Sequence, residues 1–324
     1  RLTTHSAKRI VIIGGGPAGY EAALVGARYG ADITLIEDNG LGGSAVIDDC
    51  VPSKSFIAGA NVKTDLRRAE DMGLSMKLAG DAAGAGSTRL VTALNGRVQQ
   101  LAGKQSSDIY RSVERAGVRI IAGRGTFDDY NLNQTVHYIR AEHTDGTVET
   151  IECDLVLVAT GASPRILPGA QPDGERIVTW RQIYNITELP EHLIVVGSGV
   201  TGAEFVSAFA ELGVKVTMVA SRDRILPHDD ADAADVLETV LTERGVSLVK
   251  HARVDSVVRT DDGGVLVRTS DGREIRGSHA LMTVGSIPNT QNMGVEAIGM
   301  ETTPSGHIKV DRVSRTNVPG VYAA

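Results

Sequence analysis

A glycine-rich loop behind an apolar strand occurs twice in this chain. Each copy runs from an apolar strand through the loop into a helical stretch and then into a second strand. The loops are Gly14-Gly15-Gly16-Pro17-Ala18-Gly19 and Gly197-Ser198-Gly199-Val200-Thr201-Gly202, at a constant offset of 183 positions. One such loop is a weak signal. Two copies in the same register and context predict two βαβ units, each of which binds a dinucleotide.

The residue types of these loops suit a pyrophosphate. Glycines allow a tight turn and let the backbone approach the phosphates closely, and the helix that follows offers free N–H groups and the positive end of its dipole. We therefore predict cofactor contacts at both loops, at Gly14, Gly16, Pro17, Ala18, Gly19, Gly197, Ser198, Gly199, Val200, Thr201 and Gly202.

The two copies differ at the end of the second strand. Glu37 and Asp38 end the first copy, whereas the position equivalent to Glu37 is Ala220, which Ser221 and Arg222 follow. A carboxylate accepts hydrogen bonds from ribose hydroxyls and repels a 2′-phosphate, and a small residue followed by a hydroxyl and a guanidinium does the reverse. The first site is predicted to bind FAD and the second NADP(H), with NAD(H) as the alternative. A solvated surface charge is the alternative interpretation of Arg222.

The composition is that of a globular protein of two domains, with 324 residues, 42% hydrophobic and 23% charged. A net charge of −7 and an aromatic content of 4% argue against a nucleic-acid partner. No apolar run reaches the length of about 18 residues that a membrane span needs. Cys50 and Cys153 provide no disulfide framework, so we expect a cytoplasmic protein.

The expected fold class is α/β, with two Rossmann-like dinucleotide-binding domains. We assign residues 1–163 to the first part of an FAD-binding domain, 164–283 to an NAD(P)-binding domain and 284–324 to a return to the first domain. Within the first part, the patterns predict helices over 52–73 and 90–116. Between them, the composition of residues 79–88 is typical of a flexible loop.

Further motifs link this chain to a known family. Residues 40–54 read Gly-Leu-Gly-Gly-Ser-Ala-Val-Ile-Asp-Asp-Cys-Val-Pro-Ser-Lys. This segment resembles the active-disulfide motif G-G-T-C-x-x-x-x-C-x-P-S-K of the pyridine-nucleotide flavoprotein disulfide reductases. Ala159-Thr160-Gly161 and Gly285-Ser286-Ile287-Pro288-Asn289 resemble the A-T-G and G-R-x-P-N motifs of the same family. The resemblance covers nearly the whole chain and implies further cofactor contacts at Gly43, Ser44, Gly125, Ala159, Thr160, Gly161 and Gly285.

The chain departs from the family pattern at the disulfide itself. Ala45 stands where the family has its first cysteine, so that only Cys50 remains. Thiol–disulfide exchange needs an attacking and a resolving thiol, so reduction of lipoamide or glutathione is expected to be absent or feeble. Asp48 and Asp49 disfavour the Cys50 thiolate if their side chains point towards it. A helix cap or a solvated turn is the alternative for this acidic pair.

The resemblance also implies roles for two charged residues and a form of assembly. Lys54 resembles a lysine near flavin N5, and Glu204 resembles its ion-pair partner beside the nicotinamide. Two surface charges on helices are the alternative. The family's C-terminal interface domain is absent from this chain, and we expect a homodimer through that domain. Cys153 has no motif around it and is expected to be inert, and no histidine has metal-ligand spacing.

Together these features predict an FAD-dependent NAD(P)H:quinone oxidoreductase, similar to the lipoamide-dehydrogenase-like quinone reductases that lack the first cysteine. Hydride passes from the nicotinamide to the flavin, with Lys54, Glu204 and Cys50 as the catalytic candidates, and the electrons pass on to a small quinone. The alternatives are a soluble transhydrogenase, a peroxide reductase that uses Cys50 as a sulfenic acid, and a non-catalytic FAD-binding protein.

Overall fold

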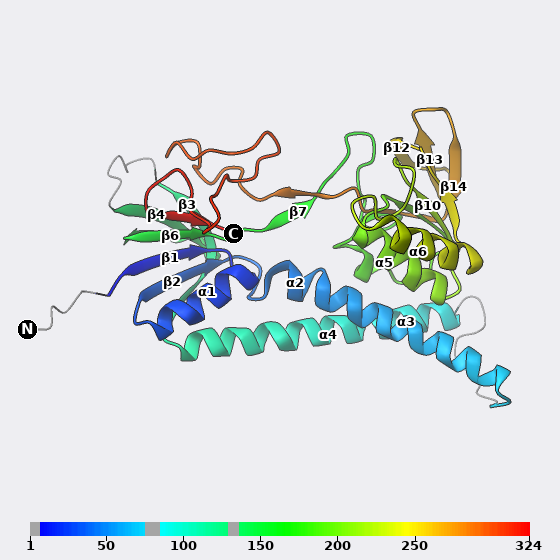
Figure 1. Ribbon diagram of the computed structural model, residues 1–324. Helices are drawn as coiled ribbons and strands as arrows, with labels where there is room; N and C mark the ends of the chain where they lie inside the picture. Colours follow the sequence, from blue (N-terminus) through cyan, green and yellow to red (C-terminus); the bar gives the residue numbers. More distant parts are fainter. Residues whose placement is uncertain (1–6, 75–84, 129–135) are drawn as a thin grey trace, which may run out of the picture. The chain divides into compact units, whose positions relative to one another are not determined.

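The computed structural model describes residues 7–74, 85–128 and 136–324, in two compact units (Figure 1). The first unit comprises the described parts of Arg1–Ile47, Ala102–Ser163 and Ile287–Ala324. The second unit comprises the described parts of Asp48–Leu101 and all of Pro164–Ser286. Each unit has its own sheet and its own apolar core.

The first unit contains a seven-stranded sheet in the order β17-β6-β1-β2-β3-β4-β5. The strands from β17 to β3 run parallel, and β3, β4 and β5 form an antiparallel meander. The strand bounds are β1 Arg9–Ile13, β2 Asp32–Glu37, β3 Arg119–Phe127, β4 His137–His143, β5 Val148–Cys153, β6 Leu155–Val158 and β17 Val321–Ala323.

The second unit contains a five-stranded parallel sheet in the order β11-β10-β9-β15-β8 and an antiparallel sheet of β12, β13 and β14. The bounds are β8 Ile177–Thr179, β9 His192–Val196, β10 Lys215–Val219, β11 Ser247–Val249, β12 Val254–Arg259, β13 Val265–Thr269, β14 Glu274–Gly277 and β15 His279–Met282. The chain passes between the units in β7 (Ala162–Pro164) and β16 (Ser286–Pro288), which pair with each other.

The helices follow the strands in βαβ order. Their bounds are α1 Pro17–Arg28, α2 Gly43–Ile47, α3 Cys50–Asp71, α4 Ala85–Arg115, η1 Ile183–Asn185, α5 Val200–Glu211 and α6 Ala231–Glu243. The predicted loop over 79–88 therefore ends earlier than expected, because α4 already begins at Ala85; residues 79–84 lie outside the described residues.

The two sheets repeat one topology. In the first, β1 lies between β2 and β6, and in the second β9 lies between β10 and β15. Ile10 is opposite Leu155, and its equivalent Leu193 is opposite His279. Each glycine loop thus follows the strand at which the chain order reverses, the point where parallel α/β sheets bind ligands. The predicted α/β fold with two Rossmann-like units is confirmed.

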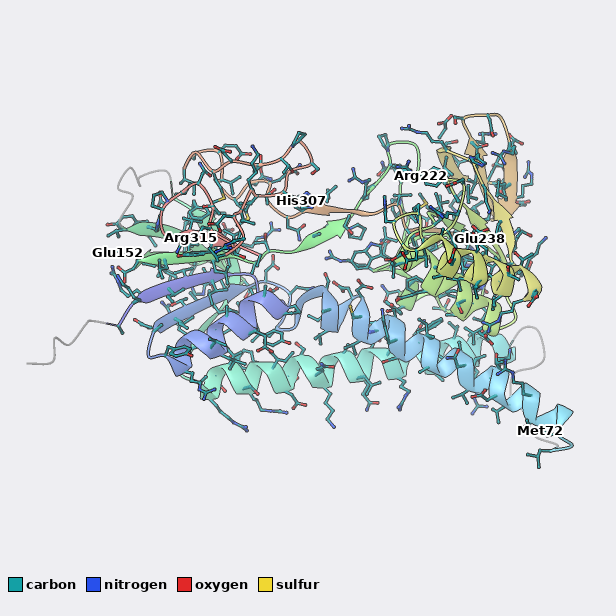
Figure 2. The ribbon with its side chains drawn as sticks, in the orientation of Figure 1. Met72, Glu152, Arg222, Glu238, His307 and Arg315 are labelled. Carbon is teal, nitrogen blue, oxygen red and sulfur yellow. The ribbon has the colours of Figure 1, made fainter. Side chains whose placement is uncertain are left out.

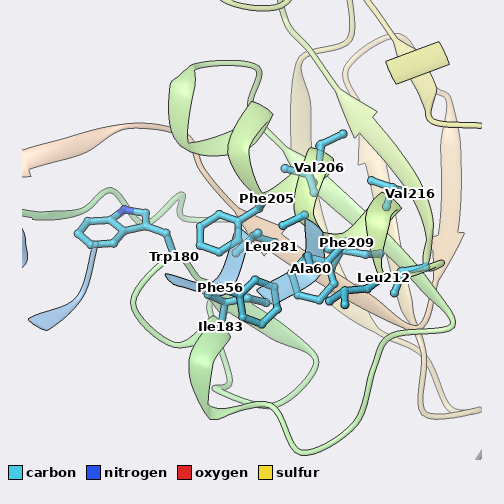
Figure 3. Packing of buried hydrophobic residues seen from close by; sticks show 14 of the residues in the cluster. Phe56, Ala60, Trp180, Ile183, Phe205, Val206, Phe209, Leu212, Val216 and Leu281 are labelled. Carbon is cyan, nitrogen blue, oxygen red and sulfur yellow. The ribbon is translucent and has the colours of Figure 1, made fainter. Parts of the chain in front are cut away.

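Residues 48–101 do not belong to the unit in which the sequence division placed them. They form part of the second unit, whereas the sequence division placed them in the first domain. The reason is the apolar face of α3: Phe56 packs against Phe209 of α5 at a ring-centroid distance of 5.3 Å, and Ala60 belongs to the same cluster (Figure 3). The first unit ends at Ser163 and resumes at Ile287.

Candidate functional site

The first glycine loop has a backbone that only glycine can adopt. Gly14 has φ +107°, and a Cβ on it would lie 2.1 Å from the Ala159 carbonyl oxygen. A Cβ on Gly19 would lie 1.8 Å from the carbonyl oxygen of Gly14. Gly16 is the N-cap of α1, and no side chain caps the helix there. The N–H groups of the first turn are therefore available to a ligand. This arrangement fits a pyrophosphate.

Glu37 closes one side of this loop. Its carboxylate accepts hydrogen bonds from the Gly15 N–H at 2.6 Å and the Asn39 N–H at 2.7 Å. Burial raises the pKa of Glu37, and these hydrogen bonds oppose that effect. The neighbouring Asp38 accepts a hydrogen bond from Arg124 at 2.9 Å. The acidic position predicted from the sequence is therefore fixed at the loop, where a carboxylate can accept ribose hydroxyl protons.

A second glycine segment lies against the first loop. The Gly42 N–H donates to the Gly15 carbonyl at 2.8 Å, and a Cβ on Gly43 would lie 2.6 Å from the Gly16 Cα. Pro17 and Ala18 form the exposed start of α1, and Ser44 follows Gly43 in α2. The two backbones leave no space for side chains between them, which explains the glycines on both sides.

The structure brings together two motifs that are far apart in the sequence. The Asn289 side-chain amide donates to the Thr160 carbonyl at 2.9 Å, and the Asn289 N–H donates to the Gly161 carbonyl at 2.9 Å. Gly161 and Gly285 both have positive φ, at +64° and +90°. Gly125 has a packing explanation instead, because it is buried in β3 and a Cβ there would lie 3.1 Å from Ile36.

The second glycine loop has the same backbone geometry. Gly197 has φ +115°, and a Cβ on it would lie 2.3 Å from the Thr283 carbonyl oxygen. A Cβ on Gly202 would also lie 2.3 Å from a carbonyl oxygen, that of Gly197. Gly199 is the N-cap of α5, again without a side-chain bond, and open space surrounds its Cβ position. Val200, the first residue of α5, is exposed, and Thr201 follows it.

The residues beyond β10 differ from those beyond β2. Ala220 and Ser198 are buried, whereas Ser221 and Arg222 are exposed. Arg222 is labelled in Figure 2. The Arg222 carbonyl accepts a hydrogen bond from the His251 N–H, and among the described residues its guanidinium makes no ion pair. A cation is thus available at the position where the first unit has an acid.

Lys54 of α3 and Glu204 of α5 form an ion pair, with 2.7 Å between Nζ and Oε1. Burial lowers the pKa of Lys54, but the hydrogen bond and the charge of Glu204 outweigh this effect and leave the pKa raised. The structure thus brings together two residues that are 150 positions apart in the sequence. The Lys54 side chain is 58% exposed, so the roles of this pair beside the flavin and the nicotinamide stay predictions.

Of the two acidic residues before Cys50, Asp48 has a partner other than the thiol. The Asp48 carboxylate pairs with the Arg181 guanidinium at 3.2 Å. Burial raises the pKa of Asp49, and the charge of Lys54 partly offsets this. Cys50 itself is exposed at the start of α3, and Ala45 lies in α2. Cys153 is buried, and burial raises the pKa of its thiol to about 12, which agrees with an inert residue.

Sequence reasoning missed Arg181 and Tyr184. Both lie in or beside η1, in a segment without any motif, and the fold carries them to the start of α3. The guanidinium of Arg181 also lies over the ring of Trp180, 5.1 Å from its centroid. A basic and an aromatic residue in a loop between two strands do not indicate which distant helix they contact, so the sequence alone could not find them.

Residues 7–74, 85–128 and 136–324 contain no group of three or more potential metal ligands. Within the same residues, no helix has both the length and the apolar character to cross a membrane.

Comparison with known proteins agrees with this geometry. An NAD(P)H dehydrogenase (quinone) of Mycobacterium tuberculosis is 54% identical over 319 residues, which are 98% of this chain and 63% of that protein. A dihydrolipoyl dehydrogenase of Bacillus subtilis is 31% identical over 97% of this chain and 66% of that protein. The chain thus spans less than two thirds of the length of either relative.

Solved structures show the same arrangement. LpdA from Mycobacterium tuberculosis superposes with a TM-score of 0.91 at 54% identity, over 98% of this chain and 67% of the other. The flavoprotein disulfide reductase RclA from Escherichia coli, solved as a Cu(II) complex, gives a TM-score of 0.79 at 25% identity over 98% of this chain and 66% of the other. A family model matches residues 8–324, a range that includes both glycine loops, and the chain therefore belongs to the pyridine nucleotide-disulphide oxidoreductase family.

Proposed function

We propose that this chain is the dinucleotide-binding part of a flavin-dependent NAD(P)H:quinone oxidoreductase. The observation that carries the proposal is the loss of the disulfide. Ala45 occupies the first redox position, and Cys50, exposed at the start of α3, has no second thiol in its segment. Electrons therefore cannot leave through a dithiol and must go to an acceptor directly. The name of the 54% identical relative supports a quinone as that acceptor.

We assign FAD to the first unit and the nicotinamide nucleotide to the second. A bound flavin takes electrons from the nucleotide and passes them on in pairs or singly. The Glu37 carboxylate and the bare N-terminus of α1 suit an adenosine ribose and a pyrophosphate. In the second unit, Glu204 holds Lys54 in its charged form near the start of α3, where the charge can orient an electron-rich group.

The test is anaerobic reduction of the purified full-length protein by NADPH and by NADH, followed by mixing with an acceptor. We expect bleaching of the flavin absorbance with either nucleotide and rapid recovery on mixing with a quinone. Brisk turnover of lipoamide would refute the proposal. Recovery with an NAD analogue alone would show a transhydrogenase, and failure of both nucleotides to bleach the flavin would show a non-catalytic binding protein.

The nucleotide preference follows from Ala220, Ser221 and Arg222. We propose that NADPH is at least as good a donor as NADH, because the exposed guanidinium can bind a 2′-phosphate. The Arg222→Ala variant is expected to weaken NADPH use by about 1–3 kcal/mol and to leave NADH use unchanged. The ratio of kcat/KM for the two nucleotides measures this effect, and an unchanged ratio removes Arg222 from the site.

The cytoplasmic location and the homodimer stay predictions from the sequence. Sedimentation of the full-length protein tests the dimer, and cell fractionation tests the location.

A further inference from the structure

His251 has a backbone conformation that favours glycine. It lies two residues beyond the end of β11, and its φ of +52° is in the left-handed region that few non-glycine residues adopt. A histidine in this region is less stable than a glycine, because glycine has no Cβ to clash. Strained residues of this kind persist where the surrounding structure fixes them, and they cluster at ligand-binding sites. The position therefore calls for an explanation.

Hydrogen bonds from two sides fix this conformation. The His251 N–H donates to the Arg222 carbonyl at 3.1 Å, and the His251 carbonyl accepts from the Arg273 guanidinium at 3.0 Å. Arg273 is itself held by Asp271, whose carboxylate accepts from the Arg273 Nε at 2.9 Å. His251 is exposed, and within the described parts of the chain its imidazole has neither a hydrogen bond nor an ion pair. The fold therefore fixes the backbone of His251 and leaves its ring available to a ligand.

His251 lies beside the residues that distinguish the second unit from the first. β10 and β11 are parallel neighbours in which Val219 is opposite Val249. Ser221 and His251 each come two residues after this pair, and the hydrogen bond at 3.1 Å joins His251 to Arg222. The carboxyl ends of parallel strands form the edge at which α/β sheets bind nucleotides. His251 thus shares this edge with the exposed Ser221 and Arg222.

The cations at this edge divide into paired and unpaired ones. Lys250 and Arg273 each form an ion pair with an acid. Among the described residues, Arg222 and His251 form none. A guanidinium and an imidazole N–H on adjacent strand ends suit one ligand that has several anionic oxygens, and a phosphate group is such a ligand.

Resting on the NADPH preference proposed above, we propose that His251 is a second specificity-determining residue of the nucleotide site, whose imidazole N–H donates to the 2′-phosphate that Arg222 binds. Both donors then act on one phosphate from neighbouring strand ends. NADH has a hydroxyl in place of this phosphate and gains no charge-assisted hydrogen bond from either residue. His251 therefore raises the affinity for NADPH alone, and its strained backbone keeps a donor at a position where glycine is the more stable residue.

The test measures the binding of two nucleotide fragments to the purified full-length protein by calorimetry. The fragments, 2′,5′-ADP and 5′-AMP, differ only in the 2′-phosphate, and their binding requires no turnover. His251→Gly is expected to weaken binding of 2′,5′-ADP about tenfold and to leave that of 5′-AMP within about twofold. Because glycine relieves the left-handed strain, the variant is expected to unfold at a temperature no lower than the unmodified protein, so unfolding does not account for the loss. Unchanged affinity for 2′,5′-ADP in His251→Gly overturns the proposal, and so does an equal loss for the two fragments.

Asn292→Gly is the matched control for the backbone change. Asn292 is an exposed residue of the first unit with φ +59°, so glycine there relieves the same kind of strain outside the second unit. Both fragment affinities are expected to stay within about twofold in this variant. A loss of 2′,5′-ADP binding as large as in His251→Gly would overturn the specific role of His251.

Arg222→Ala distinguishes a failure of His251 from a failure of the NADPH preference. If Arg222→Ala weakens binding of 2′,5′-ADP and His251→Gly does not, the NADPH preference stands and His251 has no part in it. If the unmodified protein binds the two fragments equally well, the NADPH preference itself fails, and the role of His251 fails with it.

Discussion

The two glycine loops have the same backbone conformation. They differ in one pair of residues, which is Gly15 and Glu37 in the first unit and Ser198 and Ala220 in the second. Gly14 and Gly197 have φ values of +107° and +115°, and both press against the carbonyl of a neighbouring strand end. Beside the first loop, a Cβ on Gly15 would lie 3.0 Å from the Cγ of Glu37. The second loop carries Ser198 at the position equivalent to Gly15 and Ala220 at the position equivalent to Glu37.

This difference shows that the residues beside each loop are coupled. Leu41, at 2.5 Å, and Glu37, at 3.0 Å, together crowd the Cβ position of Gly15, and the second loop has a serine there with the small Ala220 in place of Glu37. The glycines with positive φ therefore determine the shape of both loops, whereas the neighbouring pair determines which nucleotide each loop accepts.

The largest effect is expected from alanine at the first glycine of each loop. In Gly14→Ala and Gly197→Ala the new Cβ meets a backbone carbonyl at 2.1 and 2.3 Å, in a left-handed conformation. Each change is expected to destabilise its unit by about 3–5 kcal/mol. Gly14→Ala is expected to lose the flavin, and Gly197→Ala is expected to keep the flavin and lose its reduction by NAD(P)H, as absorbance spectra measure.

Gly30→Ala and Gly213→Ala are the matched controls for this experiment. They place alanine at φ +81° and +83°, where no backbone atom lies within 3.4 Å of the new Cβ. They are expected to cost only about 1 kcal/mol and to leave both cofactor functions intact. Loss of flavin from Gly197→Ala but not from Gly14→Ala would reverse the assignment of cofactors to the two units.

The repeat explains how much of the fold the sequence predicts. The positions of Gly14, Gly19, Gly197 and Gly202 follow local rules, since only glycine tolerates these dihedral angles and contacts, so the loops, strands and helices beside them are predictable. The placement of α3 is not, because Phe56 and Phe209 are 153 positions apart and any amphipathic helix has several surfaces to choose from. For the same reason Tyr184 and Arg181 escape prediction, since no spacing rule links η1 to the start of α3.

The second prediction concerns a buried histidine at a position where the first unit has an apolar residue. His279 of β15 is equivalent to Leu155 of β6, and burial, with the charge of Arg176, lowers the pKa of His279 to about 4. Between pH 6.5 and 4 the unfolded chain binds a proton that the folded second unit does not, so stability falls as the pH falls through this window.

The expected loss is about 2–3 kcal/mol across that window. His279→Leu copies the first unit and is expected to remove most of the loss, as urea unfolding at pH 7 and pH 4.5 measures. His137 and His192, whose pKa values burial also lowers, leave a smaller residual dependence. A pH dependence as steep in His279→Leu as in the unmodified protein would contradict this account.

The third prediction exchanges the residues beside the loops. Glu37→Gln weakens the acceptor of the Gly15 and Asn39 N–H groups and is expected to weaken flavin binding by about 1–2 kcal/mol.

The double variant Ser198→Gly with Ala220→Glu copies the first loop into the second and is expected to shift preference towards NADH by about tenfold or more. Equilibrium binding of flavin and the kcat/KM ratio of NADH to NADPH measure the two effects. Ala220→Glu alone is the control: with Ser198 in place the new carboxylate cannot reach the loop N–H, and use of both nucleotides is expected to fall.

The smallest effect on activity is expected at Cys50, and the other cysteine provides the comparison. Cys50 is exposed in the second unit, and Cys153 is buried in the first, where its S–H donates to the His137 carbonyl at 3.6 Å. A maleimide is therefore expected to label one thiol per native chain, and Cys50→Ser is expected to abolish the labelling. Because Ala45 already removes the dithiol route, Cys50→Ser is expected to keep quinone reduction within about tenfold, or about 1.4 kcal/mol in the barrier. A thousandfold loss with the flavin still bound would place Cys50 on the electron path, as a sulfenic acid or an intermolecular disulfide, and would remove the reason for proposing direct transfer to a quinone.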